Sequence, residues 1–238
     1  METGRLNAIV GKALTRAADE IIDGQWLDQF PVDPIQGGAG TSINMNMNEV
    51  LWNRALEILG KPKGRYDIIS PNNHANMAQS TNDVFPTGIK VCLAAKGKAL
   101  ASTLRTLEFW LDEKADEFRN VLKMGRTHLQ DAVPITLGQE MAAYASAVRR
   151  ARRRIETSLD DVHVVNMGGT AVGTGLIAEP EYSKLAAAKL SELTGEMFVT
   201  ARNMVDATNN TDVFADVSGS MKSAALVLIK MANEIRLM

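Results

Sequence analysis

The sequence has almost no cysteine. Cys92 is the only one among 238 residues, so no disulfide can form within the chain, and no Cys and His residues have the spacing of a zinc site. No apolar run approaches the roughly 20 residues that span a membrane. The N-terminal residues lack the apolar centre of a signal peptide. We therefore expect a protein of the cytoplasm, where thiols stay reduced, without structural zinc.

The chain also lacks an excess of charge of either sign. Its formal net charge is −2 and its pI is about 6.0, so the chain as a whole attracts neither nucleic acid nor an anionic membrane. Five arginines crowd into residues 149–154, but acidic residues follow closely and no aromatic residue lies among them. We expect a solvated helix face or ion pairs between helices here, and neither nucleic acid nor a membrane as a partner.

Two common catalytic signatures are missing as well. The glycines of "GGAGTS" are not followed by the Gly-Lys-Ser/Thr of a phosphate-binding loop, and no strand pattern precedes them. The sequence contains no Gly-x-Ser-x-Gly elbow. These absences argue against a P-loop nucleotide site and against an acyl-transfer triad built on such an elbow.

What the sequence does have is helical periodicity. Apolar side chains recur every three or four residues across 93–118, 137–162 and 214–235. These stripes predict bundled helices of about 25 to 35 residues each, against a mean of about 11 to 12 in globular proteins. The predicted fold class is all-α, with a long-helix bundle.

Shorter helices are predicted at 5–22, 45–59 and 183–194, each ended by a glycine that can adopt the left-handed C-terminal conformation. We find no convincing strand, repeat or flexible linker, so a single helical-bundle domain over residues 1–238 is the simplest interpretation. The last apolar period is still regular at "MANEIRLM", and we expect a chain truncated at both ends.

Four polar loops separate the predicted helices: "QGGAGTSINMN", "MAQSTNDVFPTG", "KMGRTHLQDAVP" and "NMGGTAVGTG". Each places Ser, Thr, Asn or His ahead of an apolar period, where a helix begins and its free N–H groups favour an anion. In any one loop these residues can simply cap the helix. Four such loops together predict a site for a carboxylate or phosphate group.

Two of these loops stand at the starts of long helices. Ser80, Thr81 and Asn82 are expected just ahead of one helix, with Pro86 in its first turn. Another long helix is expected to follow Thr127, His128 and Asp131. His128 is flanked by this threonine and by a nearby carboxylate, which suits a histidine that holds an anion or moves a proton.

The first loop predicts the start of a shorter helix. Ser42 can cap a helix that begins near Ile43 or Asn44, and Asn44 and Asn48 then share one helical face. Thr41 stands at the tip of the loop. Methionines in this segment, such as Met47, are expected to fill the core.

In this order the loops resemble the aspartase/fumarase superfamily across essentially all 238 residues. The matching motifs are "DQFPVDPIQGGAGTSINMNMNEV", "SPNNHANMAQSTNDVFPTG", "KMGRTHLQDAVPITLGQE" and "GGTAVGTGL". The loop "FPVDPIQGGAGTS" is more similar to the aspartases, whereas Gly169 in the last motif is more similar to the fumarases. We give the longer first loop more weight.

The resemblance implies the central helical domain of that family and reversible deamination of L-aspartate to fumarate and ammonia. Two alternatives stay open: hydration of fumarate to malate, and a non-catalytic helical oligomer or binding scaffold. By motif, the catalytic residue is His128 and the substrate-binding residues are Thr41, Ser42, Ser80, Thr81, Asn82 and Thr127. Thr41, Ser80 and Thr81 would bind the β-carboxylate, Asn82 and Thr127 the amino group and carboxylate, and His128 the α-carboxylate.

The family's base is a serine in a mobile "GSSxxPxKxN" loop, a motif that does not occur among these 238 residues. We therefore expect this chain alone to lack lyase activity. The resemblance also implies a homotetramer with sites built from three subunits and a small dicarboxylate substrate. We expect no cofactor, and no motif in the sequence requires a metal, although some aspartases respond to divalent cations. Ile177 stands where the family usually has asparagine, which calls the polar contacts of that loop into question.

Overall fold

The computed structural model describes residues 1–238, which fall into two compact units. The first unit comprises residues 1–90 and 164–210, and the second comprises residues 91–163 and 211–238. The single domain predicted over residues 1–238 stays a prediction.

Short elements build the first unit around a small apolar core. Ala13 of the first helix packs with Trp52, Ala55 and Leu56 of the second, and Ile69 closes the cluster. All five are buried, which holds the second helix firmly in place. The elements of this unit are α1 (Ala8–Ile22), η1 (Leu27–Gln29), α2 (Thr41–Ile58), the π-helical turn η2 (Pro71–Ala75), the start of α3 (Thr81–Glu117), β3 (Val164–Val165), α5 (Tyr182–Thr194), β4 (Val199–Thr200) and α6 (Met204–Asn209).

The glycine-terminated helices are confirmed. Gly24, Gly60 and Gly195 end α1, α2 and α5 with φ values of 86°, 67° and 70°, which side-chain-bearing residues rarely adopt. The start of α2 differs from the prediction, because the helix begins at Thr41 rather than several residues later. Met47 is also not core filler in this chain, since 37% of it is exposed.

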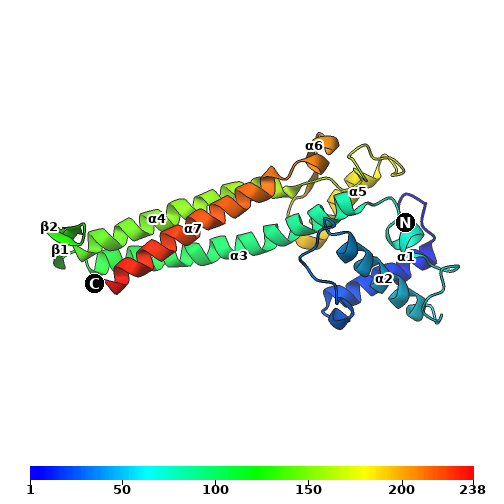
Figure 1. The fold of residues 1–238 in the computed structure, drawn as a ribbon, viewed down its shortest axis with the longest axis horizontal. Coiled ribbons are helices and arrows are strands. Elements are labelled where there is room, and N and C mark those ends of the chain that lie inside the picture. Colours follow the sequence, from blue (N-terminus) through cyan, green and yellow to red (C-terminus); the bar gives the residue numbers. More distant parts are fainter. The chain divides into compact units, whose positions relative to one another are not determined.

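Three long helices lie side by side in the second unit (Figure 1). They are α3 from Val91 onward, α4 (Leu137–Asp160) and α7 (Asp212–Arg236), with the short η3 (Asp161–His163) after α4. Lengths of 37, 24 and 25 residues confirm the predicted bundle of long helices. Helices α3 and α4 approach closely at Gly97, where an added Cβ would lie 2.6 Å from the Leu159 side chain. No helix of the chain combines the length and the hydropathy needed to cross a membrane.

The arginine run forms the predicted ion pairs between helices. Arg149 Nε and Arg152 Nε donate to the two carboxylate oxygens of Glu108 on α3, at 2.5 and 3.0 Å. Arg149 also reaches Asp112 at 2.7 Å, and Arg152 reaches Glu156 on its own helix at 2.7 Å. The packing of α4 on α3 therefore accounts for these two arginines.

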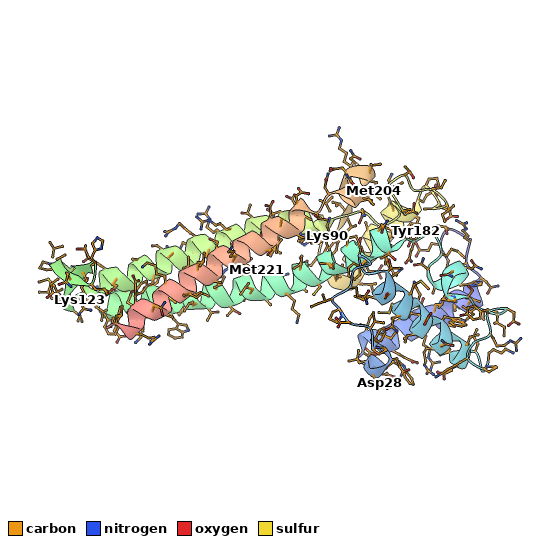
Figure 2. The ribbon with its side chains drawn as sticks, in the orientation of Figure 1. Asp28, Lys90, Lys123, Tyr182, Met204 and Met221 are labelled. Carbon is orange, nitrogen blue, oxygen red and sulfur yellow. The ribbon has the colours of Figure 1, made fainter.

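A β-hairpin joins α3 to α4, so the prediction of no strands is wrong. Strand β1 (Leu122–Thr127) pairs antiparallel with β2 (Gln130–Thr136), with an irregularity between Met124 and Arg126. A glycine in β1 and a proline in β2 obscure the two-residue period that would have revealed them. Lys123 in β1, labelled in Figure 2, donates to Glu140 of α4 and so ties the hairpin to the helix. In the first unit, β3 and β4 form a two-residue parallel pair.

Candidate functional site

The start of α3 carries three of the predicted site residues. Ser80 and Asp83 cap the helix reciprocally: Ser80 Oγ accepts the Asn82 N–H at 3.2 Å, and Asp83 Oδ1 accepts the Ser80 N–H at 2.9 Å. This arrangement satisfies N–H groups near the helix start. The helix begins at Thr81, so Thr81 and Asn82 lie in its first turn and not ahead of it as predicted.

Asn82 is fixed through both its main chain and its side chain. Pro86 lies in the second turn of α3, not in the first as predicted, and its missing N–H leaves the Asn82 carbonyl without a helical donor. The buried Asn166 supplies one instead, because its Nδ2 donates to Asn82 O at 3.0 Å. The Asn82 Nδ2 donates to Ala171 O at 2.7 Å. The Asn82 Oδ1 is left to accept a hydrogen bond from a ligand.

Asp83 holds the glycine-rich loop that begins at Asn166 against α3. It is fully buried, and its Oδ2 accepts the N–H groups of Gly168 at 3.1 Å and Thr170 at 2.9 Å. Burial raises the pKa of the Asp83 carboxyl, while the backbone N–H bonds act in the opposite direction. Sequence reasoning missed Asp83, although the Ser-x-x-Asp spacing of a helix cap is visible in "STND".

Behind Thr81 lies a group of three asparagines, Asn44, Asn48 and Asn76, which we call the amide cluster. Asn44 Nδ2 donates to Thr81 Oγ1 at 3.1 Å and to Asn76 Oδ1 at 3.3 Å. Asn48 Nδ2 donates to Asn44 Oδ1 at 3.3 Å and to Asn76 Oδ1 at 3.1 Å. Asn44 and Asn48 share one face of α2 as predicted, and both are buried. Asn76 went unnoticed because nothing in the local sequence marks it.

The first turn of α2 lies next to the first turns of α3. Gly40 precedes the helix with a φ of 88°, and a Cβ there would lie 2.5 Å from the Phe85 ring of α3. Glycine is therefore required at this position on two grounds, its conformation and the close approach. Thr41 is exposed, and its Oγ1 donates to Gly38 O at 2.8 Å.

The start of α2 has no side-chain cap. Gly40 is the capping residue, so the prediction that Ser42 caps the helix is wrong. The N–H groups of Ser42 and Ile43 have no acceptor within the chain, no acidic residue lies in the first turn, and Ser42 is exposed. Such a helix start can accept an anionic group.

Thr127 and His128 lie in the second unit, at the tip of the hairpin. His128 and Leu129 form a two-residue turn with φ values of 50° and 59°, and both are exposed. Asn and Gly normally occupy such turns, because other side chains disfavour positive φ. The following helix is capped instead by Thr136 and Gln139. The prediction that Thr127 and His128 stand at a helix start is therefore wrong.

The predicted site residues thus fall into two groups. Adjacent helix starts of the first unit bring together Thr41, Ser42, Ser80, Thr81 and Asn82. Thr127 and His128 belong to the second unit, and the roles of all seven stay predictions. No group of three or more His, Cys, Asp or Glu side chains is placed to hold a metal ion.

Residues 2–238 match the model of a protein family described as Lyase. The chain belongs to this lyase family. The chain is 52% identical, over all 238 residues, to the aspartate ammonia-lyase of Bacillus subtilis strain 168, of which it covers 50%. It spans about half the length of the curated relatives it matches.

Two solved structures are similar to this chain. One is the fumarate lyase:delta crystallin from Brucella melitensis bound to cobalt, with a TM-score of 0.95 and 44% identity over 99% of this chain and 51% of that one. The other is the class II fumarase of Schistosoma mansoni, with a TM-score of 0.91 and 33% identity over 98% of this chain and 52% of that one. The predicted superfamily and its helical-bundle fold are confirmed.

Ile177, where the resemblance predicts asparagine, has a left-handed backbone conformation. Its φ is 70°, and a β-branched side chain is strained in this left-handed region, whereas asparagine tolerates it. The Ile177 carbonyl accepts a hydrogen bond from Arg5 Nη1, which also pairs with Glu179 at 3.0 Å. The backbone at Ile177 therefore has a conformation that suits asparagine better than isoleucine.

Proposed function

We propose that this lyase chain belongs to an enzyme that reversibly converts L-aspartate to fumarate and ammonia. The observation that carries the proposal is the 52% identity to the Bacillus subtilis aspartate ammonia-lyase across every residue of this chain. A small dicarboxylate is then the substrate, and we propose no cofactor. We place the enzyme in the cytoplasm, in keeping with a single Cys92 that is free.

This reaction requires fixed hydrogen-bond donors. Removal of a proton from the carbon beside the β-carboxylate gives an aci-carboxylate intermediate with two negative charges, which donors already in place stabilise best. The hydroxyls of Ser80 and Thr81 and the N–H group of Ser42 are such donors at the two helix starts. We assign the β-carboxylate to Thr41, Ser80 and Thr81, and Thr41 must exchange its bond to Gly38 O for one to the carboxylate.

The remaining roles follow from exposure and hydrogen-bonding capacity. Asn82 Oδ1 accepts from the substrate amino group, Thr127 helps to hold a carboxylate, and His128 contacts the α-carboxylate as the catalytic residue of this chain. Thr127 and His128 are exposed at the hairpin tip, which suits residues that complete a site on another subunit.

A homotetramer with sites shared between subunits is part of the proposal. It is supported by large apolar side chains that are more than half exposed on the long helices, where a monomer would leave them in water. They are Phe109 and Trp110 on α3 and Leu226 and Ile229 on α7.

The base is proposed to be a serine of the "GSSxxPxKxN" loop, which does not occur in these 238 residues. The 238-residue chain then binds dicarboxylates without turning them over. Fumarate hydratase is the second candidate, favoured by the 33% identity to the Schistosoma mansoni class II fumarase. A non-catalytic helical scaffold is the third.

The coding sequence on either side of these residues tests the proposal. A GSS motif with a downstream lysine supports an active lyase, and its absence favours the scaffold. The gene product is then supplied with L-aspartate or L-malate, and fumarate is followed by its ultraviolet absorbance. We expect fumarate from L-aspartate; fumarate from L-malate alone would favour the hydratase. Fumarate production by the 238-residue chain alone would contradict the assigned base.

A further inference from the structure

In the amide cluster, Asn44 and Asn48 both donate hydrogen bonds to Asn76, and Asn76 donates in turn to the backbone. Asn76 Nδ2 donates to Gln79 O at 3.3 Å, which identifies the other side of that amide as the oxygen. Asn44 and Asn48 must then point their NH₂ groups at Asn76 Oδ1, as observed. A flipped Asn44 amide would face the Asn76 oxygen with its own oxygen, so the cluster specifies the Asn44 orientation.

This orientation determines what the Thr81 hydroxyl can do. Asn44 Nδ2 donates to Thr81 Oγ1 at 3.1 Å, so one lone pair of that oxygen is occupied. The Thr81 hydroxyl hydrogen donates to no group of the chain, and Thr81 is only half-buried. Thr81 is therefore presented to a ligand mainly as a donor. An ionised carboxylate accepts hydrogen bonds at both oxygens, whereas a carboxamide accepts at one oxygen only and donates from its NH₂. Ser80 Oγ likewise accepts from the Asn82 N–H, so its hydroxyl is a second donor beside Thr81, and only a carboxylate can accept from both with its two oxygens.

We propose that Asn44 is a positioning residue that, held by Asn48 and Asn76, keeps the Thr81 hydroxyl as a donor and makes the start of α3 prefer a carboxylate over a carboxamide. The inference rests on the proposed function, because it explains how that site distinguishes an acidic substrate from its amide. It assigns the discrimination to a buried residue that does not itself touch the ligand.

The test compares succinate with its monoamide, succinamate, by calorimetric titration of the full 238-residue chain. The variants are Asn44→Asp, Thr81→Val, the two combined, and Asn53→Asp. The carboxylate introduced by Asn44→Asp accepts the Thr81 hydrogen and reverses the hydroxyl. Asn53→Asp adds the same charge to α2 about two and a half turns further on, and the acceptor of the Gly64 N–H is kept.

We expect Asn44→Asp to reduce the preference for succinate over succinamate roughly tenfold or more, as for loss of a hydrogen bond to a charged group. The same change in the Thr81→Val background should have a much smaller effect, because the hydroxyl is gone. Asn53→Asp should keep the preference. An equal effect of Asn44→Asp in both backgrounds would mean that the substitution acts only through its added charge. This result would overturn the inference.

Further results distinguish a variant that does not fold, an inference that is wrong and a proposed function that is wrong. If Asn44→Asp does not fold, as judged by circular dichroism, Thr81→Val and Thr81→Ser decide: valine should lose the preference and serine should keep it. If the Thr81→Val chain keeps the full preference for succinate, the inference is overturned but the proposed function is not. An unsubstituted chain that binds neither succinate nor fumarate contradicts the proposed function, and the inference fails with it.

Discussion

Ile177 occupies a backbone conformation that suits asparagine better than isoleucine. Its φ of 70° strains a β-branched side chain, and 65% of the residue is exposed, so the side chain gains little from packing. We expect Ile177→Asn to raise the free energy of unfolding by about 1 kcal/mol, measured by urea denaturation. Leu176→Asn, at an exposed neighbour without a positive φ, is the control. Equal effects of the two substitutions would rule out relief of backbone strain.

The ion pair between Glu20 and Arg54 predicts that the first unit loses stability in acid. Hydrogen bonds from Arg54 and then from Trp26 lower the pKa of Glu20 from 4.5 to about 2. Because the folded pKa lies below the unfolded value, the stabilisation is present above about pH 4.5 and is lost as the pH falls towards 2. Glu20→Gln should therefore lose less stability than the unsubstituted chain over this range, as followed by acid titration of the circular dichroism signal. A Glu20→Gln curve with the same shape as that of the unsubstituted chain would count against the ion pair.

Local sequence patterns indicate the polar helix starts but not the atoms that organise them. Ser80 and Thr81 were recognisable because hydroxyls before an apolar period are typical of helix starts. Asn76 and Asn166 act through contacts with residues 28 to 84 positions away in the chain, which no local pattern encodes. Ser42 was misjudged because Gly40 turns the chain into α2 by its conformation, without a side-chain hydrogen bond.

Among the elements, the hairpin between α3 and α4 carries strain at its tip. His128 and Leu129 both have positive φ in a turn that favours Asn-Gly. Replacing the pair with Asn-Gly should raise the free energy of unfolding by about 1 to 2 kcal/mol, measured by thermal unfolding. Leu129→Ala keeps a Cβ at the strained position and should change stability much less.

The same exchange bears on the proposed role of His128. In the complete enzyme, the Asn-Gly tip should reduce turnover even though the chain becomes more stable. Unchanged turnover would contradict the catalytic assignment of His128, and unchanged stability would contradict the strain.

The long helices were predictable because a single physical pattern, an apolar side chain every three or four residues, extends over many turns. The hairpin was not, since its strands are short and mostly exposed and Pro134 interrupts one of them. The position of Pro86 in the second turn of α3 is equally hard to predict from the local sequence. Its place in the second turn is tolerated because Asn166 supplies the missing donor from a distant part of the chain.

For the whole molecule, the proposed homotetramer makes a direct prediction about α7. Leu226 and Ile229 are 59% and 57% exposed, and burial between subunits would remove this apolar surface from water. The unsubstituted chain should sediment as a tetramer, and the double substitution Leu226→Lys with Ile229→Lys should sediment as smaller species. The apolar exchange Leu226→Ile with Ile229→Leu keeps this surface apolar and should leave the assembly intact. A monomeric unsubstituted chain would contradict the proposed assembly.

The chain leaves the first unit after Lys90 and returns to it at Val164. Lys90 Nζ donates to Val164 O at 2.6 Å, so the points of departure and return are held together within the first unit. The segment of α3, the hairpin and α4 between Lys90 and Val164 therefore begins and ends at neighbouring points of the first unit. Insertions or deletions of about two turns, made equally in α3, α4 and α7, would keep the apolar faces of the three helices opposite one another. They would not alter the hydrogen bond between Lys90 and Val164. Such changes in length would leave the chemistry of the helix starts unaltered but would displace Thr127 and His128, so the proposed shared site constrains the length of the long helices.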